Sequence, residues 1–120
     1  MFVSTFLSCA ISEINLKETG AKLLGQQELI ELFSQDRVAT LSSSSGAVEK
    51  HYLPDGTQKM IWPGGGDEGR YEIENGQFCS KWKEMRAGEE ECYRIYLTED
   101  SEYIWVKLDG SYDSKMIMKK

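Results

Sequence analysis

The chain has 120 residues, of which 40% are hydrophobic and 28% charged, the size and composition of one globular domain with a single core. Its formal net charge of −6 disfavours binding to nucleic acid and to anionic membrane surfaces, because phosphate groups would be repelled. No apolar run approaches the ~20 residues of a transmembrane helix, so no membrane span is expected.

The first residues contain a short apolar run that ends in the small residues Ser8-Cys9-Ala10. This ending is similar to a secretory cleavage site, but no positively charged stretch precedes the run. Residues 1–12 are therefore interpreted either as the remnant of a signal peptide or as an apolar N-terminal segment that packs on the core. Residues 13–120 are predicted to form a single β-rich domain.

Helical periodicity is found in residues 13–36. Apolar side chains between Leu24 and Phe33 recur at spacings of three and four, which predicts an amphipathic helix that covers the sheet or one end of a barrel. Gly25 weakens this pattern, so a break there is an alternative to one continuous helix. Thr19 is a candidate N-cap, since its hydroxyl can accept a hydrogen bond from a free backbone N–H.

From Arg37 onward, apolar and polar residues alternate between regularly placed turn residues, which indicates short strands joined by hairpins. The predicted fold is mainly β (α+β): an antiparallel β-meander of about eight strands, forming a curled sheet or a small closed barrel, with the N-terminal helix packed on it. The eight predicted strands are Arg37–Leu41, Ala47–Leu53, Thr57–Trp62, Arg70–Ile73, Gln77–Trp82, Glu91–Leu97, Glu102–Leu108 and Lys115–Met118.

Turn residues mark the connections between these strands. Pro54-Asp55-Gly56 and Asn75-Gly76 predict tight hairpins, because Pro fixes φ and Gly or Asn tolerates positive φ; Asp109-Gly110 predicts a third. The segment 42–46 is predicted to be a flexible surface loop, and Gly64–Gly69 a mobile inter-strand loop.

Four segments carry a family resemblance: His51–Thr57, Trp62–Ile73, Asn75–Cys79 and Glu91–Tyr96. Their order resembles a family of small exported bacterial proteins of unknown function, in which a tyrosine and Asp-Gly hairpin is followed by a glycine-rich loop and two cysteine-bearing strands. The chain has Tyr71 where that family usually has Trp. The resemblance implies a β-rich fold and a periplasmic or secreted location, and it implies no activity.

Cys79 and Cys92 lie on two predicted neighbouring strands joined by a charged loop. If these strands pair, the cysteines can lie opposite each other, which predicts a cross-strand disulfide. Closing a loop of about 14 residues would stabilise the fold by roughly 3 kcal/mol. The alternative is a pair of reduced core cysteines in a cytoplasmic protein.

No catalytic or metal-binding set is predicted, and no cofactor. His51 is the single histidine, and the cysteines lack the paired spacing of a zinc site. Gly64–Gly69 resembles a phosphate-binding loop, but Asp67 and Glu68 would repel an anion there. The aromatic residues are instead the candidates for binding a ligand. Most of these must form the core, and those predicted to line a pocket or binding face are Trp62, Tyr71, Trp82, Tyr96 and Trp105.

The leading functional hypothesis is a non-enzymatic binding module, periplasmic or secreted, for an unknown small ligand or envelope protein. A second hypothesis is a small hydrolase in which Asp67 or Glu68 acts with His51 across neighbouring strands. A third is an inhibitor that presents the acidic 83–90 loop to the basic cleft of a partner enzyme. A concave pocket with converging titratable groups would distinguish the hydrolase.

Overall fold

The computed structural model describes residues 12–119, so the interpretations of residues 1–11, including Cys9, lie outside the described residues. Neither α-helix of the described part has the length and apolar character needed to cross a membrane. The elements are α1 (Glu13–Glu18), β1 (Lys22–Leu23), α2 (Gln26–Leu32), β2 (Arg37–Ser43), β3 (Gly46–Tyr52), β4 (Thr57–Trp62), β5 (Gly65–Glu74), β6 (Gln77–Trp82), the 3₁₀ turn η2 (Met85–Gly88), β7 (Glu91–Leu97), β8 (Tyr103–Lys107) and β9 (Tyr112–Met118).

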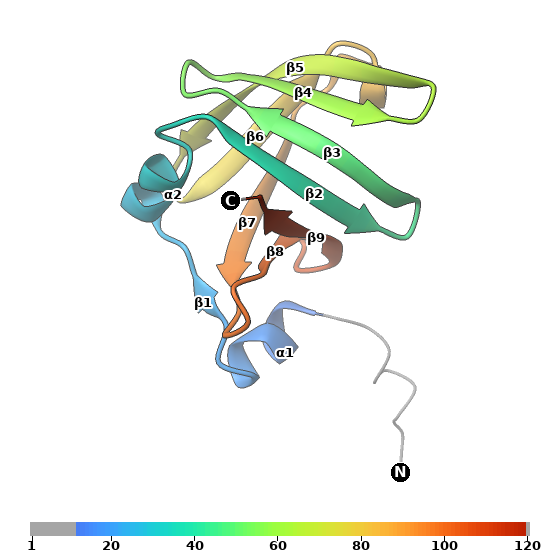
Figure 1. Ribbon diagram of the computed structural model, residues 1–120. Coiled ribbons are helices and arrows are strands. Elements are labelled where there is room, and N and C mark those ends of the chain that lie inside the picture. The colour runs from blue at the N-terminus through green and yellow to red at the C-terminus, as the bar shows by residue number, and fades with distance from the viewer. Residues whose placement is uncertain (1–11, 120) are drawn as a thin grey trace.

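Strands β2 to β9 form a closed antiparallel barrel in sequence order (Figure 1). Each strand pairs with the next along the chain, and β9 pairs with β2 to close the sheet. The predicted β-meander and eight-stranded barrel are thereby confirmed. The two-residue strand β1, which the sequence pattern did not predict, extends the sheet because Lys22 and Leu23 pair with the end of β7.

The N-terminal segment forms two short helices instead of one continuous helix. The alternative prediction, a break at Gly25, is therefore confirmed. Ser12 caps α1 through its side chain, and Gly20, with a φ of 87°, follows the end of that helix. Gly25 is the N-cap of α2 and has extended backbone geometry. Thr19 is the C-cap of α1, so its prediction as an N-cap was wrong: it ends one helix instead of starting the next.

Helix α2 covers one end of the barrel, opposite the β2–β3 and β4–β5 hairpins (Figure 1). Its Leu29 and the following Phe33 are buried in the main core. The Phe33 ring lies 5.0 Å from the Tyr52 ring and 4.9 Å from the Phe78 ring, measured between centroids. The helix therefore closes this end of the barrel with apolar side chains, as expected for an amphipathic helix.

Helix α1 packs on the outside of the barrel. Leu16 forms a second buried cluster with Tyr96 and Ile104, whose side chains alternate away from the interior. The Glu13 carboxylate accepts hydrogen bonds from Arg94 Nε at 2.7 Å and from the Tyr96 hydroxyl at 2.7 Å. The hydrogen bond from Arg94 holds the pKa of Glu13 below its usual value.

The predicted hairpins at 54–56, 75–76 and 109–110 are all present between strands. The flexible loop predicted at 42–46 is mostly strand, because β2 extends to Ser43 and β3 starts at Gly46.

The glycine-rich segment 64–69 was wrongly predicted to be a mobile loop, since all but its first residue belongs to β5. A Cβ atom at Gly66 would lie 2.6 Å from the carbonyl oxygen of Met60, and one at Gly69 would clash with that of Lys81. The glycines therefore allow close approach of neighbouring strands, which is a structural role and not a sign of disorder.

Candidate functional site

The barrel interior is filled at the α2 end and hollow at the other. Near α2, the Trp105 ring packs on Phe78, with ring centroids 4.8 Å apart, and on Tyr52 at 6.4 Å. At the opposite end lies a cavity of about 330 Å³ that opens between the β2–β3 turn, η2 and the start of β9. Its apolar and aromatic lining consists of Leu41, Val48, Met60, Trp82, Met85, Tyr93 and Tyr112.

Lys50 lies in this cavity, on the inward-facing side of β3. Only 5% of its surface is exposed. Its Nζ lies 5.0 Å from the ring centroid of Trp105, 5.1 Å from that of Trp82 and 5.5 Å from that of Tyr52. The amine is thus surrounded by three aromatic rings at distances at which cations interact with ring faces.

Among the described residues, no hydrogen bond or ion pair joins Lys50 Nζ to another side chain. Burial lowers the pKa of Lys50 to about 7, an effect that the charge of Asp113 opposes and that of Arg86 reinforces. A lysine buried without a carboxylate partner is rare in protein cores. Its presence here marks the cavity as a candidate site.

Basic side chains outnumber acidic ones around the cavity. Lys50, Arg86 and Lys107 line it together with one carboxylate, Asp113. An Arg86 nitrogen lies 3.9 Å from the Asp113 carboxylate, and Arg86 also pairs with Glu91 outside the cavity. Lys50 and Lys107 are therefore the basic lining residues that have no carboxylate within ion-pair distance among residues 12–119.

The 83–90 loop is held over the cavity by specific contacts. Asp67 Oδ2 accepts hydrogen bonds from the backbone N–H groups of Met85 at 2.9 Å and Glu84 at 3.2 Å. Arg86 and Ala87 adopt left-handed backbone conformations, with φ of 56° and 54°. This conformation places Met85 and Arg86 in the lining of the cavity. The loop's predicted role in inhibiting a basic enzyme stays a prediction.

Two of the five aromatic residues predicted to bind a ligand belong to this site. Trp82 lines the cavity, and Trp105 lies beneath the Lys50 amine. Period-two alternation explains both, because each lies on the inward face of its strand.

The other three predicted ligand residues lie elsewhere. Trp62 sits at the β4–β5 hairpin, where it pairs with Gly65. Tyr71 lies near α2, and its hydroxyl donates a hydrogen bond to the carbonyl of Leu53. Tyr96 is buried under α1 on the outside of the barrel.

The sequence reasoning missed Lys50, Arg86 and Asp113. A signal for Lys50 was present, since Val48, Lys50 and Tyr52 alternate along β3 and must share one face. No such pattern identifies Arg86, which belongs to an irregular turn.

The hydrolase hypothesis requires His51 to act with Asp67 or Glu68, but His51 and Asp67 bind different groups. His51 points away from Lys50 in the alternation of β3, and its Nε2 lies 2.7 Å from Glu49 Oε2. Asp67 binds the backbone of the 83–90 loop, as described above. Asp67 and Glu68 line a shallow depression with Lys59 that does not include His51.

Another depression, of about 610 Å³, is wider and more open to solvent than the barrel cavity. It includes the exposed side chains of Arg70, Lys81 and Lys83. It contains no buried charged side chain, so it lacks the feature that distinguishes the barrel cavity.

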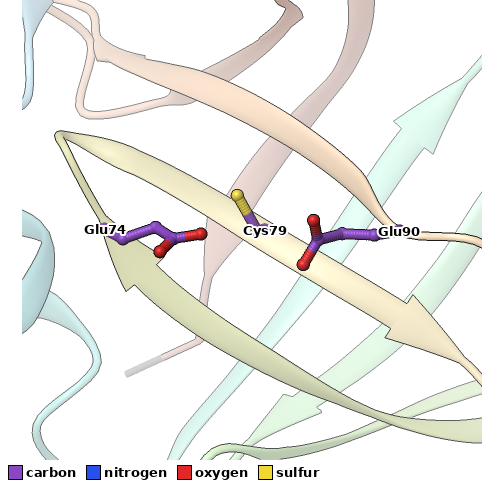
Figure 2. Close-up of side chains that lie close together, drawn as sticks. All are labelled: Glu74, Cys79 and Glu90. Atoms are coloured by element: carbon purple, nitrogen blue, oxygen red, sulfur yellow. The ribbon is translucent and has the colours of Figure 1, made fainter.

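Glu74, Cys79 and Glu90 bring two carboxylates and a sulfur within 4.8 Å of one another (Figure 2). The two carboxylates are exposed and lie on either side of Cys79. Because Cys79 forms a disulfide, its sulfur is not available as a thiolate ligand. We assign no metal site to this group.

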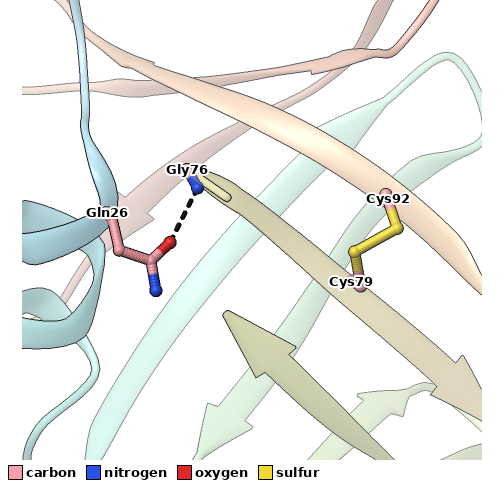
Figure 3. Close-up of a disulfide and its surroundings, with 4 residues drawn as sticks. All are labelled: Gln26, Gly76, Cys79 and Cys92. Atoms are coloured by element: carbon pink, nitrogen blue, oxygen red, sulfur yellow. Dashed lines mark hydrogen bonds between the residues drawn. A yellow bond between two sulfur atoms is a disulfide. The ribbon is translucent and has the colours of Figure 1, made fainter. Parts of the chain in front are cut away.

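The disulfide joins Cys79 of β6 to Cys92 of β7, which are directly opposed in the strand register (Figure 3). The predicted cross-strand bridge is therefore present. The same figure shows how the β5–β6 hairpin is attached to α2: Gln26 Oε1 accepts a hydrogen bond from the Gly76 N–H at 2.7 Å. Both contacts fix β6, the strand that carries Trp82.

Comparisons of this chain with family models, curated proteins and solved structures gave no significant match. The resemblance to a family of small exported bacterial proteins stays a prediction.

Proposed function

We propose that this protein is a non-enzymatic binding module that holds a small anionic ligand with an apolar ring body in the mouth of its barrel. The observation that carries the proposal is the buried Lys50 side chain, whose amine faces a cavity and has no counter-charge within ion-pair distance among the described residues. Such a residue costs stability, and natural proteins retain local conflicts of this kind mainly at functional sites.

The composition of the lining supports the ligand class. Trp82, Met60 and Tyr93 offer apolar and aromatic contacts, while Lys50, Arg86 and Lys107 offer positive charge. Small-molecule sites combine apolar contacts with a few polar groups that fix the orientation of the ligand, and this cavity offers both kinds of contact. At about 330 Å³, the cavity is near the lower end of the roughly 300–1,000 Å³ of such sites, so it suits a one- or two-ring molecule.

We place the protein in the periplasm or outside the cell. The Cys79–Cys92 disulfide supports this location, because disulfides persist in oxidising compartments and are rare in the cytoplasm.

The proposal is tested with a matched pair of naphthalene probes that differ in charge. Binding of 2-naphthoate and of 2-naphthylmethylammonium is measured by isothermal titration calorimetry at about pH 6, where Lys50 is mostly protonated. We expect the anion to bind at least about tenfold more tightly than the cation, a difference of about 1.4 kcal/mol.

Two variants locate the binding. Lys50→Met is expected to weaken 2-naphthoate binding at least about tenfold, whereas Lys59→Met makes the same change at an exposed position and is expected to leave it unaltered. Equal affinity for both probes, or equal binding by the two variants, would show that the cavity is not an anion site.

A further inference from the structure

We propose that Lys50 also captures aldehydes covalently, by forming a reversible imine between its Nζ and the carbonyl carbon of a ligand with an apolar ring body. The inference rests on the proposed function because the aldehyde must enter the same cavity. It extends that function from holding a ligand by charge to holding one by a covalent bond.

The surroundings of Lys50 meet the requirements of an amine nucleophile. The amine must be unprotonated, free of competing partners and reachable by the carbonyl group. Lys50 Nζ makes no hydrogen bond or ion pair within residues 12–119, and it contacts the cavity that opens at the barrel mouth. Its methylene stem is buried, which fixes the position of the amine in the cavity.

The charged and titratable groups around Lys50 come from several elements. Tyr52 flanks it on β3; the groups that face it from η2, β7, β8 and β9 are Arg86, Tyr93, Lys107, Tyr112 and Asp113. Burial lowers the pKa of Lys50 to about 7 against the opposing charge of Asp113. About half of the Lys50 amines are thus neutral at pH 7, compared with roughly one in 2,500 for an exposed lysine of pKa ~10.4.

The aromatic rings also favour the product. The amine adds to the aldehyde carbon to give a carbinolamine, and the carbonyl oxygen leaves as water with both N–H hydrogens, so that the C=N bond replaces C=O. When this imine takes up a proton from solvent, it becomes a cation in the position of the ammonium group. The faces of Trp105, Trp82 and Tyr52, at 5.0–5.5 Å, then stabilise it.

The probe for this reaction is 2-naphthaldehyde, which has the ring body of 2-naphthoate. The protein is incubated with it at about pH 7.5 in sodium cyanoborohydride, which reduces the imine to a stable secondary amine, and the modified lysines are identified by peptide mass mapping. We expect Lys50 to be modified at least about tenfold faster than any exposed lysine. Lys50→Met abolishes this fast phase, and Lys59→Met retains it.

Competition provides a measurement on the unaltered chain. Saturating 2-naphthoate is expected to slow the modification of Lys50 at least about fivefold and to leave the exposed lysines unaffected. Binding of 2-naphthoate without preferential modification of Lys50 would overturn the covalent inference and leave the proposed function standing. Fast modification of Lys50 in a protein that does not bind 2-naphthoate would support the inference and overturn the anionic ligand class. Failure of both probes would overturn both proposals.

Discussion

Lys50 occupies a position at which an apolar side chain would stabilise the barrel. The neighbouring inward positions along β3 are Val48 and Tyr52, which contribute apolar side chains to the interior. Lys50 instead places a charged amine over the Tyr52 ring. The folded state holds Lys50 with a pKa of about 7, whereas the unfolded chain would hold it near ~10.4. The difference is a cost to folding at every pH at which the unfolded lysine is charged.

Replacing this side chain with an apolar one of similar length should therefore stabilise the protein. We expect Lys50→Met to raise the free energy of unfolding by about 2–4 kcal/mol at pH 7, measured by urea denaturation. The gain should be constant below about pH 7 and shrink from there to about pH 10, because only the unfolded lysine stays protonated in that interval. Lys59→Met, at an exposed site, should change stability by less than about 0.5 kcal/mol. A destabilised Lys50→Met would mean that the amine makes a favourable interaction in the folded barrel.

At the scale of the elements, the β6–β7 pair is the shortest seam of the barrel within the described residues. It has three registered pairs, Phe78 with Tyr93, Cys79 with Cys92 and Ser80 with Glu91, whereas β5 and β6 share six. The disulfide lies at the middle of the three. It also bridges the base of the 83–90 loop, whose Met85 and Arg86 line the cavity.

Loss of the disulfide should weaken both the seam and the site. We expect Cys79→Ala/Cys92→Ala to lower the free energy of unfolding by about 3 kcal/mol, because the unfolded chain regains the entropy of a loop of about 14 residues. Denaturation is measured in a Cys9→Ala background, so that no third thiol complicates the comparison. A loss below about 1 kcal/mol would show that the β6–β7 seam is stable without the bridge.

At the scale of the whole molecule, the barrel has two unequal halves. The half next to α2 is packed with the rings of Phe33, Tyr52, Phe78 and Trp105. The other half holds the cavity and is bounded by hairpins and the 83–90 loop. Local stability follows packing density, so the two halves should open independently.

Hydrogen–deuterium exchange with mass spectrometry tests this division. Amides around Phe78 and Trp105 are expected to exchange slowly, through global unfolding, while those of 43–46, 62–65 and 83–90 exchange at least about tenfold faster. Binding of 2-naphthoate should slow amide exchange in 83–90 and leave the exchange rates around Phe78 and Trp105 unchanged. Uniform exchange across the barrel would indicate that the cavity end is as rigid as the packed end.

The sequence determined those features that depend on neighbours along the chain. Alternation predicted the strands, Asn75-Gly76 and Pro54-Asp55-Gly56 predicted hairpins, and together these set Cys79 opposite Cys92. Features that depend on distant partners were missed. Strand β1 exists because Lys22 and Leu23 find a free edge of β7, and the glycines of β5 are in a strand because two other strands approach them closely.

The same distinction applies to the candidate site. The alternation of side chains along each strand is enough to place Lys50, Trp82 and Trp105 on inward faces and Tyr96 on an outward face. Only closure of the sheet between β2 and β9 decides which inward side chains meet at each level of the barrel. The combined volume of the side chains at each level leaves one end of the barrel filled and the other hollow. Only the tertiary structure decides this, because the side chains come from eight different strands.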